Sequence, residues 1–386
     1  MSSRLFRWEL KKICAIPMFW IFITLCVGFN SILVFSGRYD QDYVSYVAEV
    51  TNVIGGQMGS IFDDDLDGLP DDEYKEILVA LTLGAEDNLE GYSAKELAEY
   101  YIRTFHITGV SAELLEHKFE LLQESINNLA DNNASLSLAI GRMTQQIYEN
   151  LFGSVCRFIV AEGMILAVLL ALYSSGCEGI HKTASVVYTS RTGRRVQKCK
   201  LAAGVIASLA SYAVIAILSV LIFSLTWQLG PIWNASMSTQ FYSVNMFGIV
   251  TPFISWVEFS VAWYLAAILT LGSVLVAIFS LIGFSTGLIT GNMYHGFLVF
   301  LLFVASEFGL IMLSGDSGNW PIFQLVQWTP IPLWMALNSW FTGLGLATVI
   351  PYQECWSALL WVFLSSLTVY LFYHRFLRKD VKELAA

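Results

Sequence analysis

Six long apolar stretches constrain the fold of this sequence more than any other feature. Only 13% of the 386 residues are charged and 56% are hydrophobic, and Leu201 to Val257 contains no charged residue at all. Soluble domains carry roughly 25% charged residues. About 20 apolar residues in a helix cross a hydrocarbon core of about 30 Å. The sequence predicts membrane spans at residues 17–36, 156–175, 201–226, 259–282, 296–313 and 356–374.

The charged residues are sorted along the chain. Residues 38–150 hold 22 of the 31 acids but only 6 of the 21 Lys and Arg residues. Most of the remaining bases lie in three clusters, at residues 4–12, 182–200 and 375–382. Basic clusters beside apolar spans mark the cytoplasmic side of a membrane. We therefore expect both termini in the cytoplasm and the acidic region outside the cell.

The acidic region has helical signatures. Ser93 followed by Glu96 forms a capping-box pattern. Apolar residues recur at helical spacing between Leu114 and Leu129, and a third helix is expected from about Ala134 to Phe152. The predicted fold is an all-α polytopic membrane protein with six transmembrane helices. A small α-helical extracellular domain at residues 38–152 separates the first two spans.

The N-terminal unit is predicted at residues 1–37. Residues 3–12 mix Leu, Phe and Trp with Arg and Lys, as in an amphipathic helix lying at the inner membrane interface. The alternative is a simple positive flank of the first span. Residues 153–386 are expected to hold the other five spans.

The uncharged segment 317–353 is rich in aromatic residues and proline. Irregular backbone at membrane depth is tolerated only where protein buries it or where it lines a cavity. The segment is predicted to form re-entrant half-helices near the outer leaflet. The alternative is an aromatic belt lying flat at the interface.

The motifs of nucleotide triphosphate binding and of zinc proteases are missing from the sequence. It contains no GxxxxGK[ST] or HExxH pattern, and its five histidines are scattered. No basic surface of the nucleic-acid type remains beyond the three clusters. We therefore expect a chain that is not an enzyme, holds no cofactor of its own and binds no nucleic acid.

Two acids fall within or close to predicted spans, Glu162 and Glu307. An ionisable group in a span is costly, and it is by default a functional hypothesis. A role in substrate passage is one interpretation of both. Pairing at the interface is the other, with Arg157 as the partner for Glu162.

An acidic run in the outer region resembles a calcium loop, because its acids alternate before a glycine. The twelfth position is Tyr74 in place of the usual glutamate. A solvated acidic turn is the alternative to a weak calcium site. The candidate ligands are Asp63, Asp65, Asp67 and Asp71.

The loop between the second and third spans, residues 177–200, reads CEGIHKTASVVYTSRTGRRVQKCK. An acid and a glycine open it, a short apolar–polar helix follows, and a Ser-Arg step precedes the bases that enter the next span. This order resembles the first cytoplasmic loop in the transmembrane subunits of type-2 ATP-binding-cassette (ABC) exporters, whose ATPase is a separate chain. The matching residues are Glu178, Gly179, Thr183, Ser190, Arg191 and Lys198.

That resemblance implies a function. The loop helix would dock on one of two ABC ATPase subunits, which would carry ATP and magnesium. A second permease copy or homologue would complete a path for an amphipathic or hydrophobic substrate, such as a peptide, an antibiotic or a lipid-like molecule. Arg191 and Arg194 are candidates to pair with acids on the ATPase. Anchoring to anionic lipid is the alternative, and it is the interpretation preferred for Arg195 and Lys200.

The predicted function is therefore that of an ABC exporter permease in a bacterial plasma membrane. Two alternatives remain. One is an ion-coupled secondary carrier, which would need internal repeats and a carboxylate near the membrane centre. The other is a membrane receptor or immunity protein that acts through its outer domain without transport.

Overall fold

Long helices dominate the computed structural model of the chain. Within the residues that the structure describes, six of them are long and apolar enough to cross a membrane: α2 (Pro17–Ser36), α9 (Arg157–Ile180), α11 (Val196–Trp227), α12 (Val261–Thr290), α13 (Met293–Asp316) and α16 (Gln353–Arg378). The prediction of a mainly α-helical protein with six helices able to span a membrane is confirmed. The structure describes residues 3–37, 40–54, 56–58, 73–82, 85–181, 183–190, 193–227, 230–246, 248–316 and 318–378.

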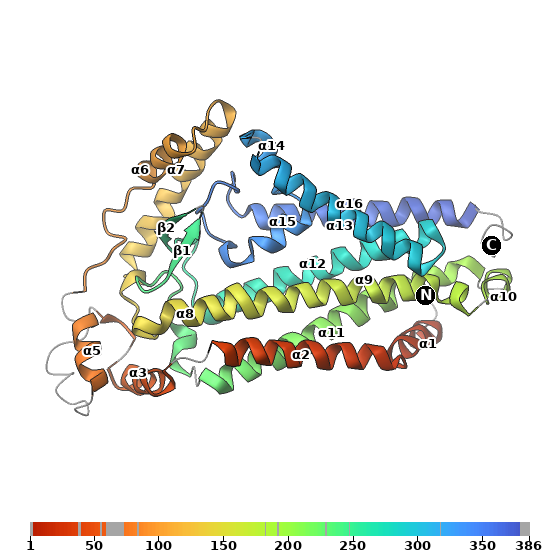
Figure 1. Cartoon of the computed structure of the whole chain (residues 1–386), viewed down its shortest axis with the longest axis horizontal. Helices are drawn as coiled ribbons and strands as arrows, with labels where there is room; N and C mark the ends of the chain where they lie inside the picture. The colour runs from red at the N-terminus through yellow and green to blue at the C-terminus, as the bar shows by residue number, and fades with distance from the viewer. Residues whose placement is uncertain are drawn as a thin grey trace.

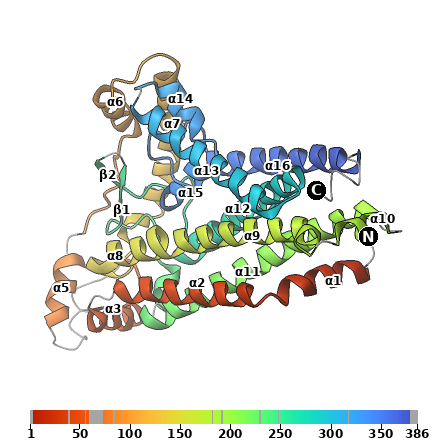
Figure 2. The same cartoon turned by 45° about the vertical axis from the view of Figure 1, so that its right-hand side comes forward.

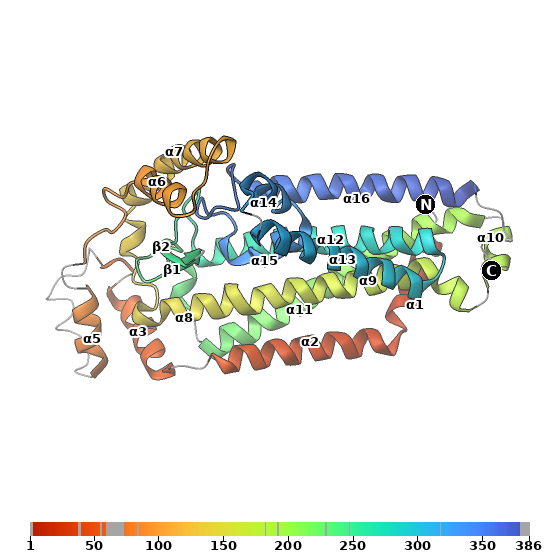
Figure 3. The same ribbon diagram turned by 45° about the horizontal axis from the view of Figure 1, so that its top comes forward.

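The long helices lie side by side, and the shorter elements gather at the two ends of the bundle (Figure 1). At one end lie α1 (Ser3–Cys14), α10 (Ala184–Thr189) and the last turn of α16. At the other end lie α3 (Gln41–Ile54), α5 (Glu73–Thr82), α6 (Ala94–Thr104) and α7 (Val110–Asp131) (Figures 2 and 3). The basic segments thus share one end and the acidic region occupies the other.

Helix α9 forms the centre of the bundle. Of its most apolar window, 72% is buried within the protein, against 17% for α13. Its main partner is α12, and glycine allows the two backbones to approach closely. A Cβ atom at Gly283 would lie 3.0 Å from the Cα of Val168, and one at Gly287 would collide with the Ser175 side chain.

The spans predicted at residues 259–282 and 296–313 leave the glycine-rich residues 283–295 as a connecting turn, and this prediction is mostly wrong. Helix α12 continues to Thr290, and the chain reverses at Gly291, whose φ of +66° is readily adopted only by glycine. Helix α13 begins at Met293. The glycines before this turn serve helix packing.

Three chain segments build the acidic end. The first contains α6 and α7, and Glu96 N donates to the Ser93 side chain as the capping box predicts. The second is the connection from α11 to α12, which adds the antiparallel hairpin β1 (Ser243–Met246) and β2 (Ile249–Pro252). This hairpin is a small exception to the all-α fold. The third is the segment that precedes α16.

The predicted helix from Ala134 begins later than expected. Residues Ala134–Leu136 form a single 3₁₀ turn after Asn133, which takes a left-handed conformation. A continuous helical run starts at Gly141, passes through α8 (Thr144–Tyr148) and a π-helical segment at Glu149–Cys156, and continues as α9. The predicted domain boundary at residue 152 lies inside this run.

Segment 317–353 contains two short helices, α14 (Trp320–Val326) and α15 (Pro330–Met335). Helix α15 contacts α9, α12, α13 and α16, and residues 330–333 are buried. Four spans therefore enclose it. This favours the half-helix interpretation of the segment over an aromatic belt lying flat on the surface.

Lys118 attaches α7 to the third segment. Its side chain is fully buried, and its Nζ donates to the carbonyl oxygen of Gly345 at 2.6 Å and lies 4.3 Å from the ring centroid of Phe119. No carboxylate of the described residues lies within 4 Å of it. Burial lowers the pKa of Lys118 to about 7.

Lys118 is expected to make stability depend on pH. The unfolded chain, with a lysine pKa of about 10.4, binds more protons than the folded protein between pH 7 and 10. The free energy of unfolding should then rise with pH in this window by up to about 1.4 kcal/mol per pH unit. Unfolding of the purified protein in detergent checks this. The slope should vanish in Lys118→Met and persist in Lys95→Met, which changes an exposed lysine; a slope retained by Lys118→Met contradicts the assignment.

Candidate functional site

The loop between α9 and α11 forms a small folded unit at the basic end of the bundle. The predicted short helix is present as α10, and a 3₁₀ turn at Gly193–Arg195 leads into α11. Gly193 has a φ of +52°, and its N–H donates to the Ser190 hydroxyl. Arg191 lies outside the described residues.

A buried ion pair closes the base of this loop. The Lys200 ammonium bonds to the Glu178 carboxylate, to the Ser174 carbonyl oxygen at 2.9 Å and to the Cys177 sulfur at 3.1 Å. The prediction that Lys200 anchors the loop to lipid is wrong, because its side chain has no exposed surface. Glu178 is equally buried, so it holds the loop to α11 from within.

Aromatic and polar contacts join the loop to the end of α16. The Tyr188 ring meets the Phe376 ring edge-on at 5.4 Å, and Gln197 donates to the Tyr188 hydroxyl at 3.1 Å. Arg194 donates to the Leu377 carbonyl oxygen at 2.7 Å, where helix ends leave carbonyls free and favour cations. Lys198 lies 5.3 Å from the ring centroid of Tyr373. Arg194 and Lys198 therefore have partners within this chain.

The outer face of the loop is exposed. Val186 in α10 is an apolar side chain that is 71% exposed. Gly179, Thr183, Thr189 and Ser190 are exposed around it. The loop thus combines a rigid base with an uncovered face of mixed polarity.

The ion pair generates a test of that rigidity. Glu178→Leu or Lys200→Met leaves the other charge buried and unpaired, which is expected to cost about 3–5 kcal/mol of folding free energy. The double variant removes both charges and should lie close to the wild type. Unfolding in detergent measures all three, and additive effects in the double variant would rule out a coupled pair.

Glu162 lies among neutral partners between three spans. Its carboxylate accepts from Asn30 of α2 at 2.9 Å, and the same amide donates to Ser219 of α11 at 3.0 Å. The predicted pairing of Glu162 with Arg157 is wrong. Five residues separate the two by about 140° around the helix axis, and Arg157 instead donates to Asn338 at 2.9 Å.

Glu307 serves the buried half-helix α15. Its carboxylate accepts from the Ile331 N–H, in the first turn of α15, at 2.8 Å. Free amides in the first turn of a helix require such acceptors. Glu354, which the sequence analysis did not single out, does the same for Phe341 N at 2.8 Å. Both acids satisfy irregular backbone.

Tryptophan side chains complete this arrangement, which no local sequence pattern identified. The indole N–H groups of Trp334, Trp340 and Trp361 donate to backbone carbonyls of Arg157, Leu333 and Trp328 at 2.7–2.9 Å. Aromatic residues next to prolines were the available sign. Their partners lie up to 177 residues away in sequence.

The cap on α15 can be tested directly. Glu307→Ala leaves the Ile331 N–H without its acceptor, which is expected to cost about 1–3 kcal/mol. Glu307→Gln retains an acceptor oxygen and should cost less. Unfolding in detergent and amide hydrogen exchange at residues 330–333 measure the effect. Equal effects of Ala and Gln would mean that the negative charge, and not the hydrogen bond, is what matters.

The calcium candidates Asp63, Asp65, Asp67 and Asp71 lie outside the described residues. Within the described part of the chain, no group of three or more His, Cys, Asp or Glu side chains is placed to hold a metal ion. The calcium interpretation thus stays a prediction.

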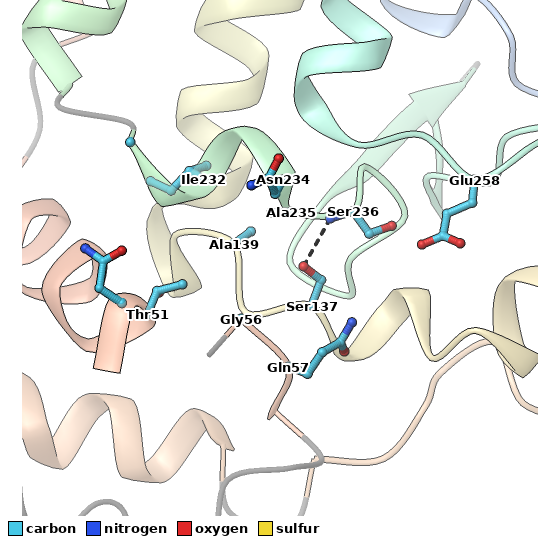
Figure 4. A pocket seen from close by; sticks show the side chains of 12 residues that line it. Thr51, Gly56, Gln57, Ser137, Ala139, Ile232, Asn234, Ala235, Ser236 and Glu258 are labelled. Carbon is cyan, nitrogen blue, oxygen red and sulfur yellow. Dashed lines mark hydrogen bonds between the residues drawn. The ribbon is translucent and has the colours of Figure 1, made fainter. Parts of the chain in front are cut away.

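A polar cavity of about 640 Å³ opens at the acidic end. Its walls come from the end of α3, from the turn at Ser137 and from the connection between α11 and α12 (Figure 4). Glu258 is the only charged residue among the described residues that line it, and Asn132 donates to its carboxylate at 3.0 Å. The remaining polar lining residues are uncharged amides and hydroxyls.

Family models, curated proteins and solved structures were compared with this chain, and none of them matches. The resemblance to exporter permeases therefore rests on the loop residues and on the layout of the spans.

Proposed function

We propose that this chain is the permease subunit of a type-2 ABC exporter in a bacterial plasma membrane. The observation that carries the proposal is the loop with α10, which is fastened to α9, α11 and α16 and presents an uncovered outer face. A short helix held in this way moves as one body with three spans. Force applied to it by an ATPase would reach the whole bundle.

The proposed topology places both termini and α10 in the cytoplasm and the acidic end outside. Helix α1 would then lie at the inner interface, where its bases meet anionic headgroups. Residues 320–335 would form the re-entrant element near the outer leaflet. Two ATPase chains would carry ATP and magnesium, and a second permease would complete the path.

The proposed substrate is amphipathic or hydrophobic, such as a peptide, an antibiotic or a lipid-like molecule. The resemblance to exporter permeases supports this class. So does the composition of the bundle, because the described spans contribute few charged side chains and most of those are satisfied within the chain.

If the outer face of the loop is where the ATPase docks, a substitution on this face should weaken ATPase binding. Val186→Asp places a charge on the exposed face of α10 without disturbing the buried base, so co-purification of an ABC ATPase with the permease should fall. Val250→Asp changes a similarly exposed valine in β2, at the other end of the protein, and should have no effect. ATPase retained by Val186→Asp, or none bound by the wild type, would contradict the proposal.

Cysteine labelling tests the topology independently. Thr189→Cys in α10 and Glu90→Cys at the acidic end are both exposed positions. In a background that lacks the native cysteines, an impermeant reagent applied to whole cells should label Glu90→Cys alone. Labelling of Thr189→Cys from outside would overturn both the threading and the function.

An ion-coupled carrier is the second candidate, and Glu162 favours it. A carboxylate buried between spans with only neutral partners is typical of ion-coupled sites. The polar outer cavity in turn favours a receptor or immunity protein. Transport that requires ATP and an associated ATPase would exclude both alternatives.

A further inference from the structure

An apolar groove runs between α2 and α9 toward the basic end of the bundle. It encloses about 380 Å³, and its walls expose no polar surface. Met293, at the start of α13, closes one side. The residues that matter for its shape are Met18, Ile21 and Leu25 of α2 and Leu166, Leu169 and Tyr173 of α9.

The groove has a closed end and an open end. The Asn30–Glu162 hydrogen bond holds α2 against α9 just beyond Leu25 and Leu166. Toward α1 the two helices diverge (Figures 1 and 2). The polar contact therefore acts as the apex of a wedge whose wide end faces the basic end of the protein.

The length of the groove matches one membrane leaflet. The lining residues on this side run from Ile16, just before α2, to Leu25, which corresponds to about 14 Å along the helix axis. Half of a hydrocarbon core is about 15 Å thick. A single acyl chain that enters from the basic end would fill this depth and stop at the Asn30–Glu162 contact.

Helix α1, which lies at the open end of the groove, is rich in bases (Figure 1). Arg7 and Lys11 of α1 are exposed. Lys12 lies close enough to Tyr173, in the groove wall, for the two to interact electrostatically. The one acid of α1, Glu9, is buried and already paired with Lys12 at 2.8 Å. Helix α1 thus brings net positive charge to this end of the groove.

We propose that this groove binds an anionic glycerophospholipid of the inner leaflet, with an acyl chain along Leu169 and the phosphate against α1. The inference rests on the membrane orientation given under the proposed function, and not on the ATPase. The bound lipid would fill the gap between α2 and α9 and fix the position of α1 relative to the bundle.

Native mass spectrometry of the purified protein tests the proposal, with equal amounts of dioleoyl phosphatidylglycerol and dioleoyl phosphatidylcholine added in detergent. The wild type should retain phosphatidylglycerol preferentially. Arg7→Gln/Lys11→Gln should lose this preference by roughly fivefold per charge removed. Leu169→Trp fills the groove and should reduce retention of both lipids.

Leu364→Trp, on the lipid-facing surface of α16, is the matched control and should leave retention unchanged. Equal retention of the two lipids by the wild type, or unchanged retention by Leu169→Trp, would overturn the proposal. Such a result alongside intact ATPase co-purification would reject the lipid site alone. A lost ATPase interaction alongside preferential lipid retention would reject the exporter assignment alone.

Discussion

Close contact between α9 and α12 is the interaction on which the rest of the structure depends. Glycines in α12 let its backbone approach α9, so that α9 is enclosed on most sides. Three of the polar contacts described above are made by residues of α9. Glu162 accepts a hydrogen bond from Asn30 of α2, and Arg157 donates one to Asn338. Glu178 forms an ion pair with Lys200 of α11. Bulk at Gly283 would therefore disturb all of these contacts together.

A second constraint is that backbone polar groups enclosed by apolar helices need partners. Regular helices satisfy their own, but the segment before α16 is irregular. The carboxylates of Glu307 and Glu354 accept hydrogen bonds from backbone amides of this segment. Indole N–H groups of tryptophans in the segment and in α16 donate to backbone carbonyls. Glu307, which its position in a span marked as a candidate for substrate passage, thus stabilises the backbone of this segment. Glu162, whose partners are side chains only, differs from them in this respect.

Much of the architecture could be predicted from local sequence. Apolar length gave all six spans, Ser93 and Glu96 gave the start of α6, and residues 183–188 gave the loop helix. Predictions failed where a residue type is compatible with two structures, or where burial depends on tertiary contacts. Glycines at 283 and 287 indicated a turn but serve packing, because glycine suits both. The ion pair of Glu178 with Lys200 was missed because burial depends on how two spans meet, and neither residue reveals this alone.

The continuous helical run from Gly141 to Gly179 has a mechanical consequence. Its 39 residues extend over about 58 Å, from the wall of the acidic end to the base of α10. In a stiff helix of this length, a small rotation about one end becomes a large displacement of the other end. A rotation of about 10° would move the far end by roughly 10 Å. Its π-helical section, next to the outer elements, is the place where such a swing would be absorbed or passed on.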